Sequence, residues 1–159
     1  MILTSLLVAL TAISHLQGNS WHCIVPLHST RADVEKILGL PTPDSKAQDA
    51  ADYRTANERV FVLYSTGSCD VKPSNGWNVS RGTVISITVE PKIKPKLADL
   101  KLDERKYEKR KDPEMLDYIY YTNEEEGVSI TVNTEEGVVN TFRYSPMSKD
   151  KHLLCPSSH

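Results

Sequence analysis

The sequence has few aromatic residues, few cysteines and no excess of either charge. Its 19 Lys and Arg side chains nearly balance its 21 Asp and Glu side chains, which gives a net charge of −2. This balance excludes a strongly basic nucleic-acid-binding protein, so we expect no nucleic-acid partner. The hydrophobic fraction of 39% excludes a disordered composition.

Motifs of catalysis are also absent from the sequence. It contains no Gly-x-Ser-x-Gly nucleophile elbow, no His-Glu-x-x-His zinc motif and no phosphate-binding loop. Dispersed Ser, His and Asp residues can still meet in space, so the catalytic residues of any enzyme stay unknown. The sequence favours a protein that is not an enzyme, and we expect no cofactor and no metal.

The first residues are typical of an export signal. The apolar run extends from Met1 to Ala12 and is too short to span a membrane as a helix, which takes about 20 residues. No Lys or Arg precedes the run. Two small-x-small cleavage sites follow, Ala12-Ile13-Ser14 and Gly18-Asn19-Ser20. We predict a signal peptide over residues 1–20, one domain over 21–159 without a transmembrane segment, and a periplasmic or extracellular location. An N-terminal core helix or membrane anchor is the alternative.

An exported protein meets an oxidising compartment, in which cysteines form disulfides. The three cysteines, Cys23, Cys69 and Cys155, allow one intrachain disulfide and leave one thiol free. We favour Cys69–Cys155, because this disulfide would tie the C-terminal tail to the body of the domain. Three unpaired thiols are the alternative.

A transition-metal site is a further alternative for the two ends of the chain. Histidine and cysteine are zinc ligands, and His152-x-x-Cys155 has the spacing of half a site. The oxidising compartment disfavours this interpretation, because cysteines there are more often paired. The remaining ligands would be His22, Cys23 and His28.

The clearest helix signal lies between Thr30 and Gly39. Thr30 is placed to cap the first turn, and Gly39 supplies the left-handed residue that ends a helix. Val34, Ile37 and Leu38 form one apolar stripe, so the helix is amphipathic and must pack on another element.

Runs of β-prone residues dominate the rest of the chain. In the run 83–89, Ile85, Ile87 and Val89 are expected on one face. The predicted fold class is α+β, with a short amphipathic helix packed on a twisted antiparallel sheet. The second half echoes the first, with a helix or turn at 97–102, which would give two helix-plus-three-strand units. The predicted strands are 52–55, 60–64, 83–89, 118–121, 128–132 and 138–144.

Two acidic turns repeat one pattern, Asn123–Gly127 and Asn133–Gly137. Each predicts a hairpin closed by a left-handed glycine, so the chain should end in a β-meander. Successive turns of a meander lie at opposite ends of a sheet. Their carboxylates therefore cannot converge on one Ca²⁺ ion, and we interpret them as solubilising turns.

Charge is segregated along the second half. Residues 92–111 carry nine Lys and Arg against four Asp and Glu, and residues 112–137 carry eight Asp and Glu and no Lys or Arg. The basic segment could bind an anionic partner. We favour an exposed strand and loop whose charges neutralise acidic neighbours.

Aromatic residues are the candidates for an interaction surface, because they are enriched where proteins bind one another. Alternate tyrosines on one face of a strand suit such a surface, whereas packing in the core is the alternative for each tryptophan. The candidates are Trp21, Trp77, Tyr118 and Tyr120.

The segment Trp21-x-x-Ile24-x-Pro26-Leu27-x-Ser29-Thr30-Arg31-Ala32-Asp33-Val34-Glu35 resembles the opening of a family of uncharacterised exported bacterial proteins. Gly76-Trp77-Asn78-Val79 and Lys149–Cys155 extend the resemblance over most of the domain. It implies export and no particular activity. Cys23 stands where the family is expected to have Gly, which supports a free Cys23. The family's usual cysteine before Tyr53 is missing here.

Residues 29–41 are also similar to the helix of the small lipoprotein of the outer-membrane barrel-assembly machinery and of β-lactamase-inhibitor-like domains. Those are helix-plus-antiparallel-sheet modules that bind proteins. We therefore expect an exported, non-catalytic module that binds a protein or an envelope component. A hydrolase-type enzyme with an unrecognised active site and a structural envelope protein are the alternatives.

Overall fold

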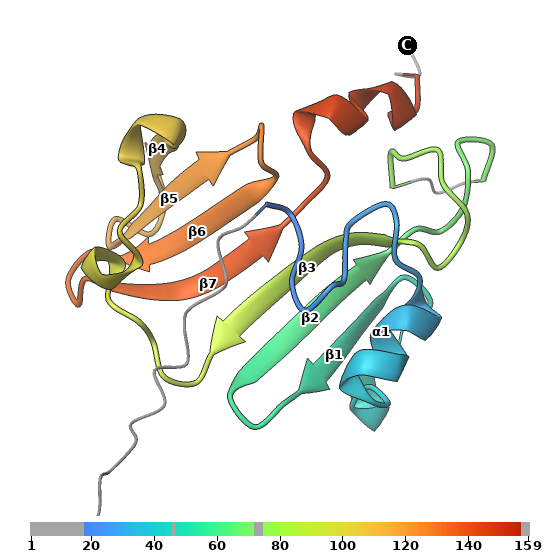
Figure 1. Ribbon diagram of the computed structural model, residues 1–159, viewed down its shortest axis with the longest axis horizontal. Coiled ribbons are helices and arrows are strands. Elements are labelled where there is room, and N and C mark those ends of the chain that lie inside the picture. Colours follow the sequence, from blue (N-terminus) through green and yellow to red (C-terminus); the bar gives the residue numbers. More distant parts are fainter. Residues whose placement is uncertain (1–17, 46, 72–74, 157–159) are drawn as a thin grey trace, which may run out of the picture.

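The computed structural model describes residues 18–45, 47–71 and 75–156, so the predicted signal peptide lies outside the described residues up to residue 17. The chain forms one seven-stranded antiparallel sheet with few helices (Figure 1). The strand order is β1-β2-β3-β7-β6-β5-β4. Within the described part of the chain, no helix is long and apolar enough to cross a membrane. The strands are β1 (Ala50–Arg54), β2 (Glu58–Tyr64), β3 (Val84–Pro91), β4 (Glu108–Lys111), β5 (Tyr118–Asn123), β6 (Val128–Asn133) and β7 (Val138–Tyr144).

Helix α1 (Arg31–Leu38) confirms the predicted caps. The Thr30 backbone N–H donates to Asp33 Oδ2 at 2.8 Å, and the Asp33 N–H donates back to Thr30 Oγ1 at 3.4 Å. The hydrogen bond from the Thr30 backbone lowers the pKa of Asp33. Gly39 has φ 81° and ends the helix. Four short 3-10 helices complete the structure: η1 (Pro43–Ser45), η2 (Leu97–Leu100), η3 (Glu104–Lys106) and η4 (Ser148–Leu153).

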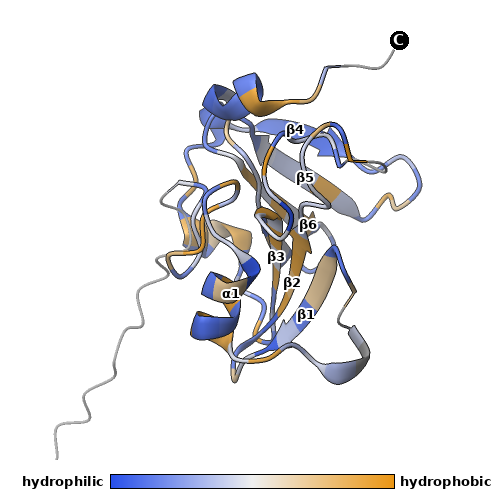
Figure 2. Cartoon of the chain, turned by 90° about the vertical axis from the view of Figure 1, so that its right-hand side faces the viewer, coloured by the Kyte–Doolittle hydropathy of each residue, from blue (hydrophilic) through white to orange (hydrophobic). Residues whose placement is uncertain are grey.

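The apolar stripe of α1 is narrower than the sequence predicts. Val34 is fully buried and Leu38 packs against the core, whereas Ile37 is 45% exposed. Arg31 also anchors the helix, because its guanidinium lies 4.1 Å from the centre of the buried Tyr64 ring and donates to Ala47 O at 3.0 Å. Figure 2 shows α1 on one side of β1, β2 and β3.

One face of the sheet carries the core. The pairing register of the strands places buried side chains side by side in a row that runs from β1, at one edge of the sheet, to β5. This core face is covered by α1, by the segment that contains Trp21 and Ile24, and by η2 with Leu102. The central row across the sheet is Tyr53, Val60, Val89, Phe142, Ile130 and Tyr121.

A bulge in β3 corrects the predicted alternation of residues 83–89. Leu63 pairs with Ser86 and Tyr64 pairs with Val84, so Ile85 is the extra residue. Val84 and Ile87 belong to the core, whereas Ile85 does not share that cluster with Ile87. A bulge reorients side chains locally, and a sequence pattern of period two cannot show this.

The second half of the chain is not a copy of the first. The helix or turn predicted at 97–102 is the 3-10 turn η2 (Leu97–Leu100), and four strands follow it. Pro95 precedes this turn and Lys101, with φ 50°, closes it, so an α-helix has no room to extend. Strand β4 is not among the six predicted strands, because its four residues are all charged and lack an apolar pattern, but it agrees with the exposed strand favoured for the basic segment 92–111.

The predicted disulfide Cys69–Cys155 is confirmed, and Cys23 is free and exposed. The two bonded residues have Cα atoms 5.4 Å apart and are separated by 86 positions in the sequence. Backbone hydrogen bonds extend the contact, because Cys155 N donates to Gly76 O at 2.9 Å and Asn78 N donates to Leu153 O at 2.8 Å. The loop after β2 and the tail after β7 are thus held together.

We predict that Cys69→Ser lowers the free energy of unfolding by about 2–5 kcal/mol, because the unfolded chain is no longer restrained by a long covalent loop. Urea denaturation followed by tryptophan fluorescence measures this loss. Cys23→Ser is the matched control, since Cys23 is exposed and unpaired, and its stability should equal that of the wild type. Equal stabilities of the two variants would contradict the prediction.

Candidate binding groove

The face of the sheet opposite the core, which we call the open face, carries polar side chains. Thr88 of β3 lies opposite Arg143 of β7, which lies opposite Ser129 of β6. Ser129 lies opposite Thr122 of β5, and its Oγ donates to Thr122 Oγ1 at 3.3 Å. A row of hydroxyl groups and one guanidinium therefore crosses the middle of the open face.

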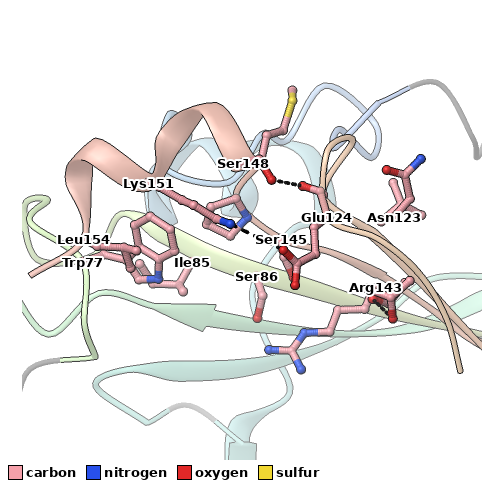
Figure 3. A pocket seen from close by; sticks show the side chains of 16 residues that line it. Trp77, Ile85, Ser86, Asn123, Glu124, Arg143, Ser145, Ser148, Lys151 and Leu154 are labelled. Atoms are coloured by element: carbon pink, nitrogen blue, oxygen red, sulfur yellow. Dashed lines mark hydrogen bonds and ion pairs between the residues drawn. The ribbon is translucent and has the colours of Figure 1, made fainter. Parts of the chain in front are cut away.

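A groove of about 480 Å³ lies on the open face between the sheet and η4. Its volume is in the range of small-molecule pockets, about 300–1,000 Å³. Ser86 and Arg143 line it from the sheet (Figure 3), and so does Ser129. At one end the side chains of Trp77 and Leu154 gather beside that of Ile85 and form an apolar wall. The groove thus combines an apolar end with a hydroxyl-rich, cationic one.

The disulfide builds this apolar wall. Trp77 lies on the loop that contains Cys69, and Leu154 directly precedes Cys155, so the covalent bond joins the two segments that supply the wall. Trp77 and Leu154 also form an isolated β-bridge. The bulge supplies the third member of the wall, because it separates Ile85 from the core cluster.

The opposite rim is the β5–β6 turn, which holds η4. Ser148 N donates to Glu124 O at 3.0 Å, and Ser148 Oγ donates to the same oxygen at 3.2 Å. Lys151 Nζ lies 3.5 Å from Glu124 Oε2, with side chains that are 61% and 70% exposed. An ion pair so exposed adds little stability, so the backbone contacts fix the rim.

The two acidic turns confirm the predicted hairpins and stand at opposite ends of β6. Asn123 Oδ1 accepts from Glu126 N at 3.0 Å, and Asn133 Oδ1 accepts from Glu136 N at 3.0 Å. Both closing glycines have φ 65°. Only the first turn lies at the groove, where a Cβ on Gly127 would meet Ser145 O at 2.3 Å. A Cβ on Gly137 would meet nothing within 4 Å.

Two polar side chains of the groove lack partners among the described residues. Arg143 forms no ion pair and no side-chain hydrogen bond there. Ser86 is only 4% exposed, and its hydroxyl likewise has no protein partner in the described part of the chain. Both side chains line the groove, so they are available to bond to a ligand there.

The predicted aromatic surface is only partly assembled. Tyr118 and Tyr120 lie half-buried on the open face of β5, and Trp77 lines the groove. Trp21 is 2% exposed and packs in the core, away from the others. The Tyr120 hydroxyl donates to Asp112 Oδ2 at 2.6 Å, and this bond lowers the pKa of Asp112. Tyr120 is therefore held in place by its own chain.

The metal alternative loses one of its ligands, because Cys155 is in the disulfide. Among the residues that the structure describes, no three His, Cys, Asp or Glu side chains are grouped so as to hold a metal ion. In the basic segment, Lys106 pairs with Glu126 at 3.1 Å, and Lys109 pairs with Glu104. These pairs show basic charges next to acidic neighbours, as the favoured interpretation expects.

Sequence reasoning did not single out Arg143 or Ser86. Nothing in the local pattern distinguishes Arg143 from other exposed arginines, and Ser86 gains its position from the bulge and from the pairing of β3 with β7. No family model matches the chain, and no curated protein and no solved structure matches it either.

We predict that Gly127→Ala destabilises the protein by roughly 3 kcal/mol, because a methyl group there combines left-handed strain with a collision against Ser145 O. The matched variant Gly137→Ala has the same φ and open space around it, and should cost only about 1 kcal/mol. Thermal unfolding of the two variants measures the difference. Equal losses would show that the turn is not pressed against the strand end.

Proposed function

We propose that the protein is an exported, non-catalytic binding module that engages a protein or an envelope component through the open face. The observation that supports this most is the groove itself, which combines an apolar wall with polar side chains that have no partners among the described residues. Phe61 adds an apolar element to the same face, because it lies opposite Thr88 and is 41% exposed.

The composition of the groove favours binding over hydrolysis. Its lining includes no His and no Cys, and its one carboxylate, Glu124, lies beside Lys151 at the rim. A hydrolase would need a nucleophile together with a base that accepts its proton. The serines of the groove have no such base beside them in the lining. A purely structural envelope protein would have no use for a groove with unsatisfied polar groups.

Export is part of the proposal, with residues 1–20 containing the signal and a twisted sheet carrying the amphipathic α1 as the mature module. The disulfide supports this, because it is the chemistry of an oxidising compartment. Asn19 favours one of the two predicted cleavage sites. It is 4% exposed, and its Nδ2 donates to Ser145 O at 3.4 Å beside the groove rim. Cleavage after Ser20 would remove this residue, so we infer cleavage after Ser14.

We predict that the exported protein begins at His15 and contains one free thiol. N-terminal sequencing of the secreted or periplasmic material identifies the cleavage site, and thiol titration after denaturation counts the cysteines. The expected count is one, from Cys23. An intact Met1, or three free thiols in correctly folded protein, would contradict export.

Site-specific photo-crosslinking tests the binding surface. A photoreactive benzoylphenylalanine at Phe61 should capture a partner in the intact envelope, because that side chain projects from the open face. The matched control is the same substitution at Ile93, which is 90% exposed but lies after β3, away from the sheet. Equal products from both positions, or none from either, would contradict binding through the open face.

A further inference from the structure

We propose that the groove receives the C-terminal end of a peptide, with its terminal carboxylate on Arg143 and an apolar last side chain against Trp77. This rests on the proposed binding function and names the ligand chemistry of the same surface. The two ends of the groove differ in chemistry, and the proposed ligand has the same two parts in the same order (Figure 3).

Arg143 supplies the charge that the ligand must balance. Its neighbours across the sheet, Thr88 and Ser129, are uncharged, and it has no ion pair among the described residues. The only anion in the lining, Glu124, lies beside Lys151. A guanidinium binds a carboxylate through two parallel hydrogen bonds, which is the strongest recognition that this lining can offer.

Ser86 is the second observation that points to a ligand. It lies two residues from Thr88 on β3, so it is the diagonal neighbour of Arg143 on the open face. The Arg143 side chain extends along the sheet toward it (Figure 3). Ser86 is 96% buried, and its unpartnered hydroxyl can donate to an oxygen held by Arg143.

The lining favours a peptide over another apolar carboxylate, such as a fatty acid. Hydroxyl groups of Ser129, Ser145 and Ser148 border the groove. Ser129 and Ser148 donate within the protein, to Thr122 Oγ1 and to the Glu124 carbonyl oxygen, so their oxygens are left to accept hydrogen bonds. Peptide N–H groups can donate to these oxygens, whereas an acyl chain has no donor.

Calorimetric titration of the full mature protein tests this proposal with defined probes. The probes are acetyl-Ala-Ala-Ala-Leu with a free carboxylate, the same peptide with a C-terminal amide, and octanoate. The acid should bind at least about tenfold more tightly than the amide, because the amide loses the charged hydrogen bonds to Arg143. Octanoate should bind more weakly than the peptide acid.

Variants test whether the difference in affinity between the acid and the amide comes from the groove. Arg143→Gln should abolish the difference between acid and amide, and Ser86→Ala should weaken acid binding several-fold. Arg54→Gln is the matched control, because Arg54 is an exposed arginine on the open face of β1, outside the groove. Its affinities should equal those of the wild type. Circular dichroism melts confirm that each variant is folded.

Three outcomes would overturn the proposal: equal affinities for acid and amide, unchanged discrimination in Arg143→Gln, or no binding of the acid at about 1 mM. Tighter binding of octanoate than of the peptide acid would replace it with a fatty-acid site. If these results came with a specific photo-crosslink at Phe61, the binding function would stand and only the ligand chemistry would fall. If the peptide acid did not bind and Phe61 gave no specific photo-crosslink, the proposed binding function would be contradicted as well.

Discussion

The pairing of β3 with β7 is the interaction on which the rest of the structure depends. Three residue pairs, from Ile87 opposite Tyr144 to Val89 opposite Phe142, join two halves that are far apart in the sequence. Without this ladder, β1–β3 would form a three-stranded sheet and β4–β7 a four-stranded one, each too small to enclose a core well. With it, buried side chains line up from Tyr53 across to Tyr121.

The same pairing creates the groove. It places Arg143, from the last strand, beside Ser86, from the third, although neither half of the chain alone brings them together. Because all covering elements of the core lie on the other face, the open face keeps its polar residues accessible. The burial of one face thus makes the second available for binding.

Local chemistry made much of this fold predictable. The caps of α1 and the two hairpin turns depend on residues three or four positions apart, so the sequence shows them directly. The disulfide followed from the position of Cys155 in the tail. Four of the six predicted strands also lie within observed strands, because their residues are β-prone and largely apolar. The other two, 52–55 and 83–89, overlap β1 (Ala50–Arg54) and β3 (Val84–Pro91) and each extends one residue beyond the observed strand.

The features that sequence reasoning missed depend on distant partners or on charge. Strand β4 pairs with β5, and its Lys109 and Arg110 side chains lie over the rings of Tyr121 and Tyr120. Its Glu, Lys and Arg side chains give no apolar strand pattern in the sequence. The bulge at Ile85 exists only relative to β2, so a single strand cannot reveal it. The sequence places Ile37 in the apolar stripe of the helix, but only Val34 and Leu38 of that stripe pack against the core. The same dependence on distant partners hid the groove residues.

The groove lies where regular structure is interrupted, and this explains its rigidity. The bulge of β3 turns Ile85 away from the core, the end of β7 releases the chain into η4, and the β5–β6 turn is pressed against Ser145 through Gly127. Each interruption is tied down, by strand pairing, by the disulfide or by backbone hydrogen bonds. If the groove binds as proposed, a site held in this way would lose little conformational entropy on binding, and a few polar contacts would suffice to recognise a small ligand. Irregularities that are stabilised at one place in an otherwise regular sheet are the pattern expected of a binding site.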